Sequence, residues 1–443
     1  MTTPSDGDIR NLMGQAGKQL AAMQLSIGDG IESGTLPNVQ DVRRRRSATA
    51  AATSDAGFLT LVRDDRGVYG WQVDAGPSPT PQRRALRRGG LFEAEPIDQV
   101  AFTPVVGSKV GEFLDKLDTG FNSRYGLFNL AGQRVDQVPT AGRVLLVVHG
   151  TFSKSEAITV PFTPVLAAAR AAGYDAVLVF EHPTLAVSPL LNALDLARAF
   201  ANSKAQVDII AHSRGGLVVR WWLEVLQRER LATSRVVFFG APLMGTALAS
   251  PFRLRSALKL MTNVAVALQG TAQLVSLALP LFTVVQGLMA LVASATSAVA
   301  NSPLADAAVA MVPGLAAMSR YGPDSEQFIL GNHELMKLSF GLTAPPAGYH
   351  MVQSNFEPTE VGWAFWRVFR DPKARLADAV TDALFAGAND LVVDTPSMAR
   401  LSSSVLMADA SKLLDFKTSP SVHHLNYFHQ ADSAAFVRRV FGF

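Results

Sequence analysis

The chain has no cysteine among its 443 residues. This absence excludes disulfide bonds, zinc sites built on thiolates and a cysteine nucleophile. The sequence also lacks a glycine-rich phosphate-binding loop and a cluster of His, Asp and Glu with metal-ligand spacing. It therefore predicts neither a cofactor nor a metal.

Net charge is also small. The chain carries 40 Lys and Arg against 37 Asp and Glu, a formal net charge of +3, so we expect no nucleic-acid partner. The N-terminal residues contain no apolar core of a secretory signal, which favours a cytoplasmic protein, with peripheral membrane association as the alternative. Two basic runs, residues 43–46 and 83–88, are interpreted as solvated surface or linker, with binding of acidic lipid headgroups or nucleic acid as the less favoured alternative.

Charge is missing altogether from residues 260–305. By length this stretch could hold one or two membrane spans, since roughly 20 apolar residues cross a bilayer. However, Pro280 interrupts it, and polar residues recur at near-helical spacing. These polar residues are Gln269, Gln273, Ser276, Thr283 and Gln286. The pattern predicts two or more helices forming an apolar cap, at about residues 250–320. Interfacial membrane contact through this cap is the main alternative, and helices that simply pack against each other are another.

The most informative motif surrounds Ser213. The run Val207-Asp-Ile-Ile-Ala-His-Ser-Arg-Gly-Gly216 is an apolar strand that ends in a small-x-Ser-x-Gly turn and leads into a helix-forming stretch. A tight turn of this kind lifts a serine hydroxyl above a sheet, where a histidine can reach it. The motif predicts that Ser213 is a nucleophile. The alternative is an ordinary helix N-cap.

An earlier buried strand is predicted at residues 143–148, and the sequence His149-Gly-Thr-Phe152 follows it. The loop after such a strand supplies one oxyanion amide, and the residue after the nucleophile supplies the other. We therefore expect the backbone amides of Thr151 and Arg214 to form an oxyanion hole, with Phe152 as a weaker alternative to Thr151. His149 is expected to be a buried histidine that orients this loop.

A base and an acid follow Ser213 in the order that this chemistry requires. Asp390 is the predicted acid and His424 the predicted base. Asp394 is the competing acid, because it lies in the same loop. His423 and His429 compete for the role of base, but neighbouring side chains alternate in direction, so His423 and His424 cannot both point at the serine.

The rest of the pattern predicts an α/β protein. Strand-like runs at residues 176–180, 207–211 and 236–239 alternate with helix-like runs at 164–172, 190–201 and 215–228. This alternation indicates βαβ units and a mostly parallel sheet. Residues 58–62 and 68–73 predict a β-hairpin. We expect residues 1–105 to be an accessory segment and residues 106–443 a catalytic domain that carries the cap.

Together these motifs resemble α/β-hydrolases of the bacterial lipase and lecithin:cholesterol acyltransferase-like group, from about Pro139 to the C-terminus. The motifs that carry the resemblance are Val148-His-Gly-Thr-Phe-Ser153, Phe180-Glu-His-Pro-Thr-Leu185, Ser188-Pro189, Asn192-Ala193, Ala211-His-Ser-Arg-Gly-Gly216, Gly240-Ala-Pro-Leu-Met-Gly-Thr246 and Asn389-Asp390. One segment departs from the group, because Met318-Ser-Arg-Tyr-Gly-Pro-Asp-Ser325 stands where such lipases usually read Met-x-Pro-x-Ser.

The resemblance implies a mostly parallel sheet with helices on both faces and an apolar helical cap. It also implies that Ser213, Asp390 and His424 form a catalytic triad and that the amides of Thr151 and Arg214 bind the oxyanion. The implied activity is cleavage of an apolar or lipid-like carboxylic ester through an acyl-enzyme. An acyltransferase, an amidase or peptidase with the same triad, and a non-catalytic, membrane-associated binding protein on the same fold remain alternatives.

Overall fold

The computed structural model describes residues 4–23, 25, 57–74, 94–102, 110–250, 254–296, 312–320, 332–370, 384–385 and 387–443. Both basic runs of the N-terminal segment lie outside these residues, as does the end of the atypical segment that starts at Met318. The chain forms two compact units. One contains residues 1–117 and 258–308, and the other contains residues 118–257 and 309–443.

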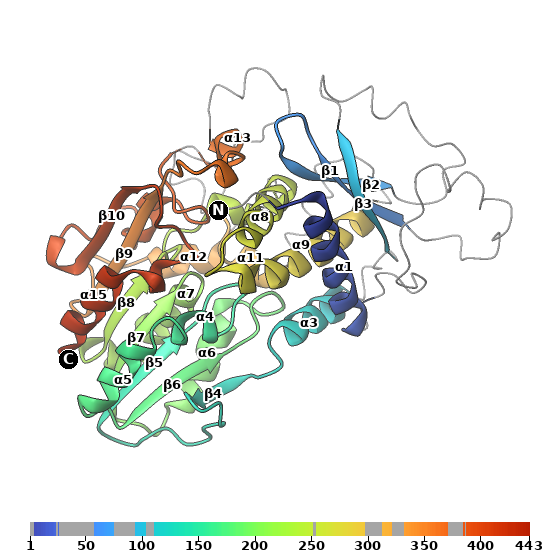
Figure 1. Cartoon of the computed structure of the whole chain (residues 1–443). Helices are drawn as coiled ribbons and strands as arrows, with labels where there is room; N and C mark the ends of the chain where they lie inside the picture. The colour runs from blue at the N-terminus through green and yellow to red at the C-terminus, as the bar shows by residue number, and fades with distance from the viewer. Residues whose placement is uncertain are drawn as a thin grey trace, which may run out of the picture. The chain divides into compact units, whose positions relative to one another are not determined.

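The first unit combines helices with a small antiparallel sheet. Its helices are α1 (Asp6–Ala22), α9 (Val275–Thr296) and most of α3 (Val110–Phe121) and of α8 (Leu254–Gln269). Its strands are β1 (Gly57–Arg63), β2 (Tyr69–Asp74) and β3 (Glu95–Phe102), in the spatial order β2-β1-β3 (Figure 1). Strands β1 and β2 form a hairpin at the predicted position. The sequence analysis did not anticipate α1 or β3. Helix α1 begins with a capping box, in which Ser5 and Asp8 bond to each other's backbone amides.

The uncharged stretch belongs to this first unit. The Asn263 side chain accepts from the Tyr69 amide at 2.9 Å and donates to the Tyr69 carbonyl at 2.8 Å, so α8 is bonded to strand β2. In α9, Thr283 donates to Gln19 of α1 at 2.8 Å. Pro280 lies inside α9 and does not end it. The described residues of this stretch therefore belong with the N-terminal residues in the first unit.

Helix α9 is long and apolar enough to cross a bilayer at Val275–Ala293, but 67% of this window is buried in the protein. A buried core helix of this composition passes the same test. Membrane contact through this region stays a prediction.

The second unit has the α/β-hydrolase fold. Its seven strands are ordered β10-β9-β8-β7-β5-β6-β4, and all neighbouring pairs are parallel except β4 with β6. The strands are β4 (Gly126–Asn129), β5 (Arg143–Val148), β6 (Ala176–Glu181), β7 (Gln206–His212), β8 (Arg235–Phe239), β9 (Tyr349–Phe356) and β10 (Leu413–Ser419). The chain order reverses around β5, which lies between β6 and β7. In open parallel sheets, sites form at the carboxyl ends of the strands near such a reversal.

Helices cover both faces of this sheet, because the central strands are buried on both sides. In β5, Val144, Leu146 and Val148 join a core cluster that contains residues of α6 and α7, whereas Leu145 and Val147 join a second cluster with residues of α5 and α15. The helices of this unit are α4 (Glu156–Thr159), α5 (Thr163–Ala171), α6 (Pro189–Ala199), α7 (Gly215–Arg220), α11 (Pro313–Ala316), α12 (His333–Ser339), α13 (Trp366–Arg370), α14 (Thr395–Met398) and α15 (Ala431–Phe441).

Candidate active site

Ser213 lies in a strained turn between β7 and α7. Its φ is +52°, a left-handed backbone conformation that is uncommon for a residue other than glycine. Its amide donates to the carbonyl of Phe239, at the end of β8, at 2.9 Å. A Cβ atom at Gly215 would lie 2.6 Å from the carbonyl oxygens of both Val148 and His149, so only glycine fits there. Strain held by tight packing is typical of functional turns.

The loop after β5 lies directly beside this turn. A Cβ atom at Gly150 would be 2.6 Å from the Cβ of Ser213. In the described part of the chain, the amides of Thr151 and Arg214 donate to no protein acceptor. By contrast, the Phe152 amide faces the Thr184 hydroxyl at 3.4 Å. Of the two candidate amides in this loop, that of Thr151 is the one left to bind an oxyanion.

Asp390 and His424 form a buried pair. The Nδ1 of His424 lies 2.8 Å from the Oδ2 of Asp390, and the His424 amide donates to the Asp390 carbonyl at 2.9 Å. The Oδ1 of Asp390 accepts from the amides of Val392 and Val393 at 3.1 and 2.8 Å. Because the carboxylate is an acceptor, we assign the proton to Nδ1, which leaves the Nε2 of His424 as the basic nitrogen.

The ends of β7 and β8 bring this pair close to Ser213. The Nε2 of His212, the residue before Ser213, donates to the carbonyl of His424 at 3.0 Å, and their rings lie 4.7 Å apart. Gly240 follows Phe239, and a Cβ atom there would lie 2.8 Å from the Oδ2 of Asp390 and 3.0 Å from the Nδ1 of His424. Among the described residues, no direct hydrogen bond joins Ser213 to His424.

The competing acid and bases have other surroundings. Asp394 faces Arg320 at 4.0 Å and accepts from the Ala247 amide at 3.2 Å, and burial raises its pKa. His423 lies between the rings of Phe356 and Trp363, at 5.1 and 5.3 Å, and burial lowers its pKa to about 3.

His429 lies at the end of the short 3₁₀ helix Tyr427–His429, and burial lowers its pKa. None of these three alternatives takes part in the hydrogen bonds between Asp390 and His424.

The sequence analysis missed Tyr427. Its side chain is fully buried, and its hydroxyl donates to the Oδ2 of Asp390 at 2.9 Å. Burial and the adjacent carboxylate raise the pKa of Tyr427 well above its usual value. The only sequence signal is its position three residues after His424, which brings both residues to the same side of a helical turn but is not distinctive.

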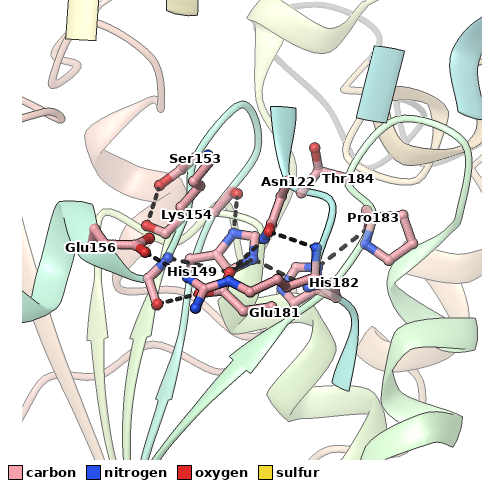
Figure 2. A network of polar contacts seen from close by, with 12 residues as sticks. Asn122, His149, Ser153, Lys154, Glu156, Glu181, His182, Pro183 and Thr184 are labelled. Carbon is pink, nitrogen blue, oxygen red and sulfur yellow. Dashed lines mark hydrogen bonds and ion pairs between the residues drawn. The ribbon is translucent and has the colours of Figure 1, made fainter. Parts of the chain in front are cut away.

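A second buried pair, His149 and Glu181, supports the loop after β5 (Figure 2). The Nδ1 of His149 donates to the carbonyl of Gly150 at 2.9 Å, and its Nε2 lies 3.3 Å from the Oε2 of Glu181. The His149 ring stacks on His182 at 4.1 Å. Glu181 also accepts from Asn122 at 2.5 Å and from the Ser155 hydroxyl. Burial lowers the pKa of His149, and Glu181 opposes this change.

The side chain of Arg214 is anchored away from its own amide. The buried guanidinium donates to Asn192 at 2.8 Å and to the carbonyl of Val187, and it lies 3.4 Å from the Nδ1 of His182. Burial lowers its pKa to about 10, so the group stays charged at neutral pH. The side chain therefore fixes the start of α7, while the amide remains available.

The residues of both pairs lie within the region that one protein-family model matches. A family model described as "Domain of unknown function (DUF7379)" matches residues 119–442. The chain belongs to this family. The DUF7379 region contains Ser213, Asp390 and His424 together with His149 and Glu181. The sequence matches no curated protein.

Several solved structures are similar to this DUF7379 chain. The Bacillus licheniformis lipase BlEst2 in mature form is 14% identical, with a TM-score of 0.35 over 69% of this chain and 92% of that one. Lipase 1 from Pelosinus fermentans is 12% identical, with a TM-score of 0.38 over 70% of this chain and 97% of that one. A thermophilic esterase from Thermogutta terrifontis is 12% identical, with a TM-score of 0.30 over 68% of this chain and 92% of that one.

Proposed function

We propose that this protein is a serine hydrolase that cleaves carboxylic esters through an acyl-enzyme, with Ser213 as nucleophile, His424 as base and Asp390 as acid. The observation that carries the proposal is the buried pair of His424 and Asp390, held at 2.8 Å beside the strained turn of Ser213. A serine hydroxyl needs an adjacent base, and that base needs a group to fix its tautomer.

In the proposed first half-reaction, the Nε2 of His424 takes the proton of Ser213 as Oγ attacks the ester carbonyl carbon. The amides of Thr151 and Arg214 donate to the oxyanion that forms. The carbonyl then re-forms, the bond to the alkoxide breaks, and His424 gives its proton to the leaving alcohol. Asp390 stabilises the imidazolium throughout and does not itself become protonated.

In the second half-reaction, water attacks the acyl group on Ser213. His424 takes a proton from this water and returns it to Ser213 as the acid product leaves. An alcohol could replace the water, so an acyltransferase of the lecithin:cholesterol acyltransferase-like kind uses the same intermediate. We propose an apolar, lipid-like ester as the substrate, on the basis of the uncharged residues 260–305.

The test is hydrolysis of p-nitrophenyl esters of increasing acyl length by the wild type and by Ser213→Ala, with and without detergent. Ser234→Ala is the matched control, because Ser234 is also a buried serine of the second unit and its hydroxyl has no partner among the described residues. We expect Ser213→Ala to lose activity, Ser234→Ala to keep it, and long chains to be preferred. Preference for short, soluble esters would contradict the lipid-like substrate. Absence of turnover on every ester, with no labelling by a fluorophosphonate, would favour a binding protein.

A further inference from the structure

We propose that Tyr427 is a positioning residue that tunes the basicity of His424 through Asp390. This inference rests on the proposed function and adds a fourth side chain to its machinery. Tyr427 is fully buried, and its hydroxyl reaches the same carboxylate oxygen that faces His424.

Hydrogen bonds occupy the acceptor positions of the Asp390 carboxylate. Oδ1 accepts from the amides of Val392 and Val393, while Oδ2 accepts from the Nδ1 of His424 at 2.8 Å and from the Tyr427 hydroxyl at 2.9 Å. Four donors match the roughly four lone-pair positions of a carboxylate. Two donors share Oδ2, so each affects the strength of the other.

Tyr427 remains a donor over the working range of pH, because burial and the carboxylate raise its pKa well above the usual value. Its donated proton draws electron density from Oδ2. Asp390 therefore stabilises a protonated His424 less strongly than it would alone. Without the phenol, Asp390 stabilises the imidazolium of His424 more strongly.

The other titratable groups around the pair do not replace this contact. His212 packs on His424 from the end of β7, and burial holds the pKa of His212 well below its usual range. His423 is also kept neutral by burial, with a pKa of about 3. Asp394 and Asp390 interact through their charges, and Asp415 interacts through its charge with Tyr427. Among the described residues, no other hydroxyl donates to Asp390.

The chain offers a matched control in Tyr349. This residue is also fully buried, and its hydroxyl donates to the Oε1 of Glu224 at 3.0 Å. Burial and Glu224 raise its pKa well above the usual value, as for Tyr427. Removing either hydroxyl leaves one buried carboxylate with one donor fewer, but only Tyr427 touches the proposed acid.

The experiment follows the rate at which a fluorophosphonate labels Ser213 as a function of pH, in the wild type, Tyr427→Phe and Tyr349→Phe. The acid limb of this profile is the range in which the labelling rate falls as pH is lowered. For Tyr427→Phe we expect the acid limb to move to higher pH by about half to one unit, the equivalent of one hydrogen bond. Its plateau rate should fall by no more than about tenfold, since the two amides still hold Asp390. Tyr349→Phe should keep the wild-type limb. An unmoved limb in Tyr427→Phe would overturn the inference.

If Tyr427→Phe does not fold, 3-fluorotyrosine introduced at position 427 gives a second test. Fluorine makes the phenol a stronger donor at almost unchanged size, so the acid limb should move to lower pH. No shift, or a shift to higher pH, would overturn the role of Tyr427. Absence of labelling at Ser213 in the wild type would overturn the proposed function itself, whereas labelling with unmoved limbs would overturn only the role of Tyr427.

Discussion

Among its described residues, the second unit contains two buried pairs of a histidine and a carboxylate, and they are arranged in opposite ways. In the first pair, Asp390 faces the Nδ1 of His424, and the described residues do not engage the Nε2. In the second pair, Glu181 faces the Nε2 of His149, and the Nδ1 is bonded to the carbonyl of Gly150. The difference lies in the second nitrogen of each ring: the Nε2 of His424 is left to accept a proton, whereas the Nδ1 of His149 is bonded to the loop after β5.

The neighbours of each pair reinforce this difference. Both nitrogens of His149 are engaged, and its ring stacks on His182, so it has no nitrogen to offer a substrate. His424 instead contacts residues at the ends of β7 and β8, close to Ser213. This difference supports the proposed role of His424 in proton transfer, and it supports a role for His149 in holding the loop after β5.

The largest expected effect comes from Asp390→Asn. An amide at this position can donate to the Nδ1 of His424, which would place the proton on Nε2 and remove the base. We expect kcat for ester hydrolysis to fall by about 10⁴, the size of effect seen when a triad acid becomes an amide. Circular dichroism should show an intact fold. A loss smaller than tenfold would mean that another carboxylate serves His424.

Gly240→Ala should cause the second-largest loss of activity. The added Cβ would lie 2.8 Å from the Oδ2 of Asp390 and 3.0 Å from the Nδ1 of His424, so the pair must shift. A displacement on the order of 1 Å near the chemistry costs about 100-fold in kcat. Gly173→Ala is the control, since Gly173 also has a positive φ, of +85°, but has open space around its Cβ position. Equal losses of activity in the two variants would show that backbone strain, not the clash, is responsible.

Glu181→Gln should have a smaller effect, because it loosens the oxyanion loop without touching the base. We expect kcat to fall by about tenfold with KM unchanged, less than the hundredfold or greater loss of an oxyanion donor. Glu224→Gln provides the comparison, since Glu224 is another buried carboxylate, paired with Arg220 at 2.8 Å. Both variants should lose stability in thermal unfolding, but only Glu181→Gln should lose kcat. A normal kcat in Glu181→Gln would make the second pair purely structural.

The last prediction concerns His423 and affects stability instead of activity. The folded protein keeps His423 neutral down to a pH of about 3, whereas the unfolded chain takes up a proton below the ordinary value of 6.5. Stability from this group is therefore complete above pH 6.5 and is lost as pH falls toward 3, by up to about 1.4 kcal/mol per pH unit. His423→Asn should flatten the fall in the free energy of unfolding between pH 6.5 and 5, measured in urea. A slope equal to that of the wild type would contradict the buried, neutral state of His423.

Much of the sheet could be predicted from the sequence, since buried parallel strands are continuous apolar runs such as residues 143–148. Chain order and local turn chemistry also indicated Ser213, Asp390 and His424, and the structure brings the last two into contact. The roles of Glu181 and Tyr427 could not be predicted in this way. Glu181 reaches His149 because β6 pairs with β5, and Tyr427 reaches Asp390 across 37 residues of chain, contacts that no local pattern encodes.

The uncharged stretch also shows that sequence patterns predict an element but not the partners it contacts. Its spacing predicted helices, and α8 and α9 are helices. Periodicity does not say which partner a helix meets, and Asn263 and Thr283 in fact bond to β2 and α1. Pro280 was expected to interrupt the run, but it lies within α9, because packing along the helix can outweigh the local cost of proline.

The most direct test of the central claim is to find where a fluorophosphonate attaches, by peptide mass spectrometry of the wild type, Asp390→Asn and Glu181→Gln. Our account predicts a single adduct on Ser213, formed about 10⁴-fold more slowly in Asp390→Asn and only about tenfold more slowly in Glu181→Gln. An adduct on another residue, or equal slowing in the two variants, would contradict the assignment of proton transfer to the Asp390 and His424 pair.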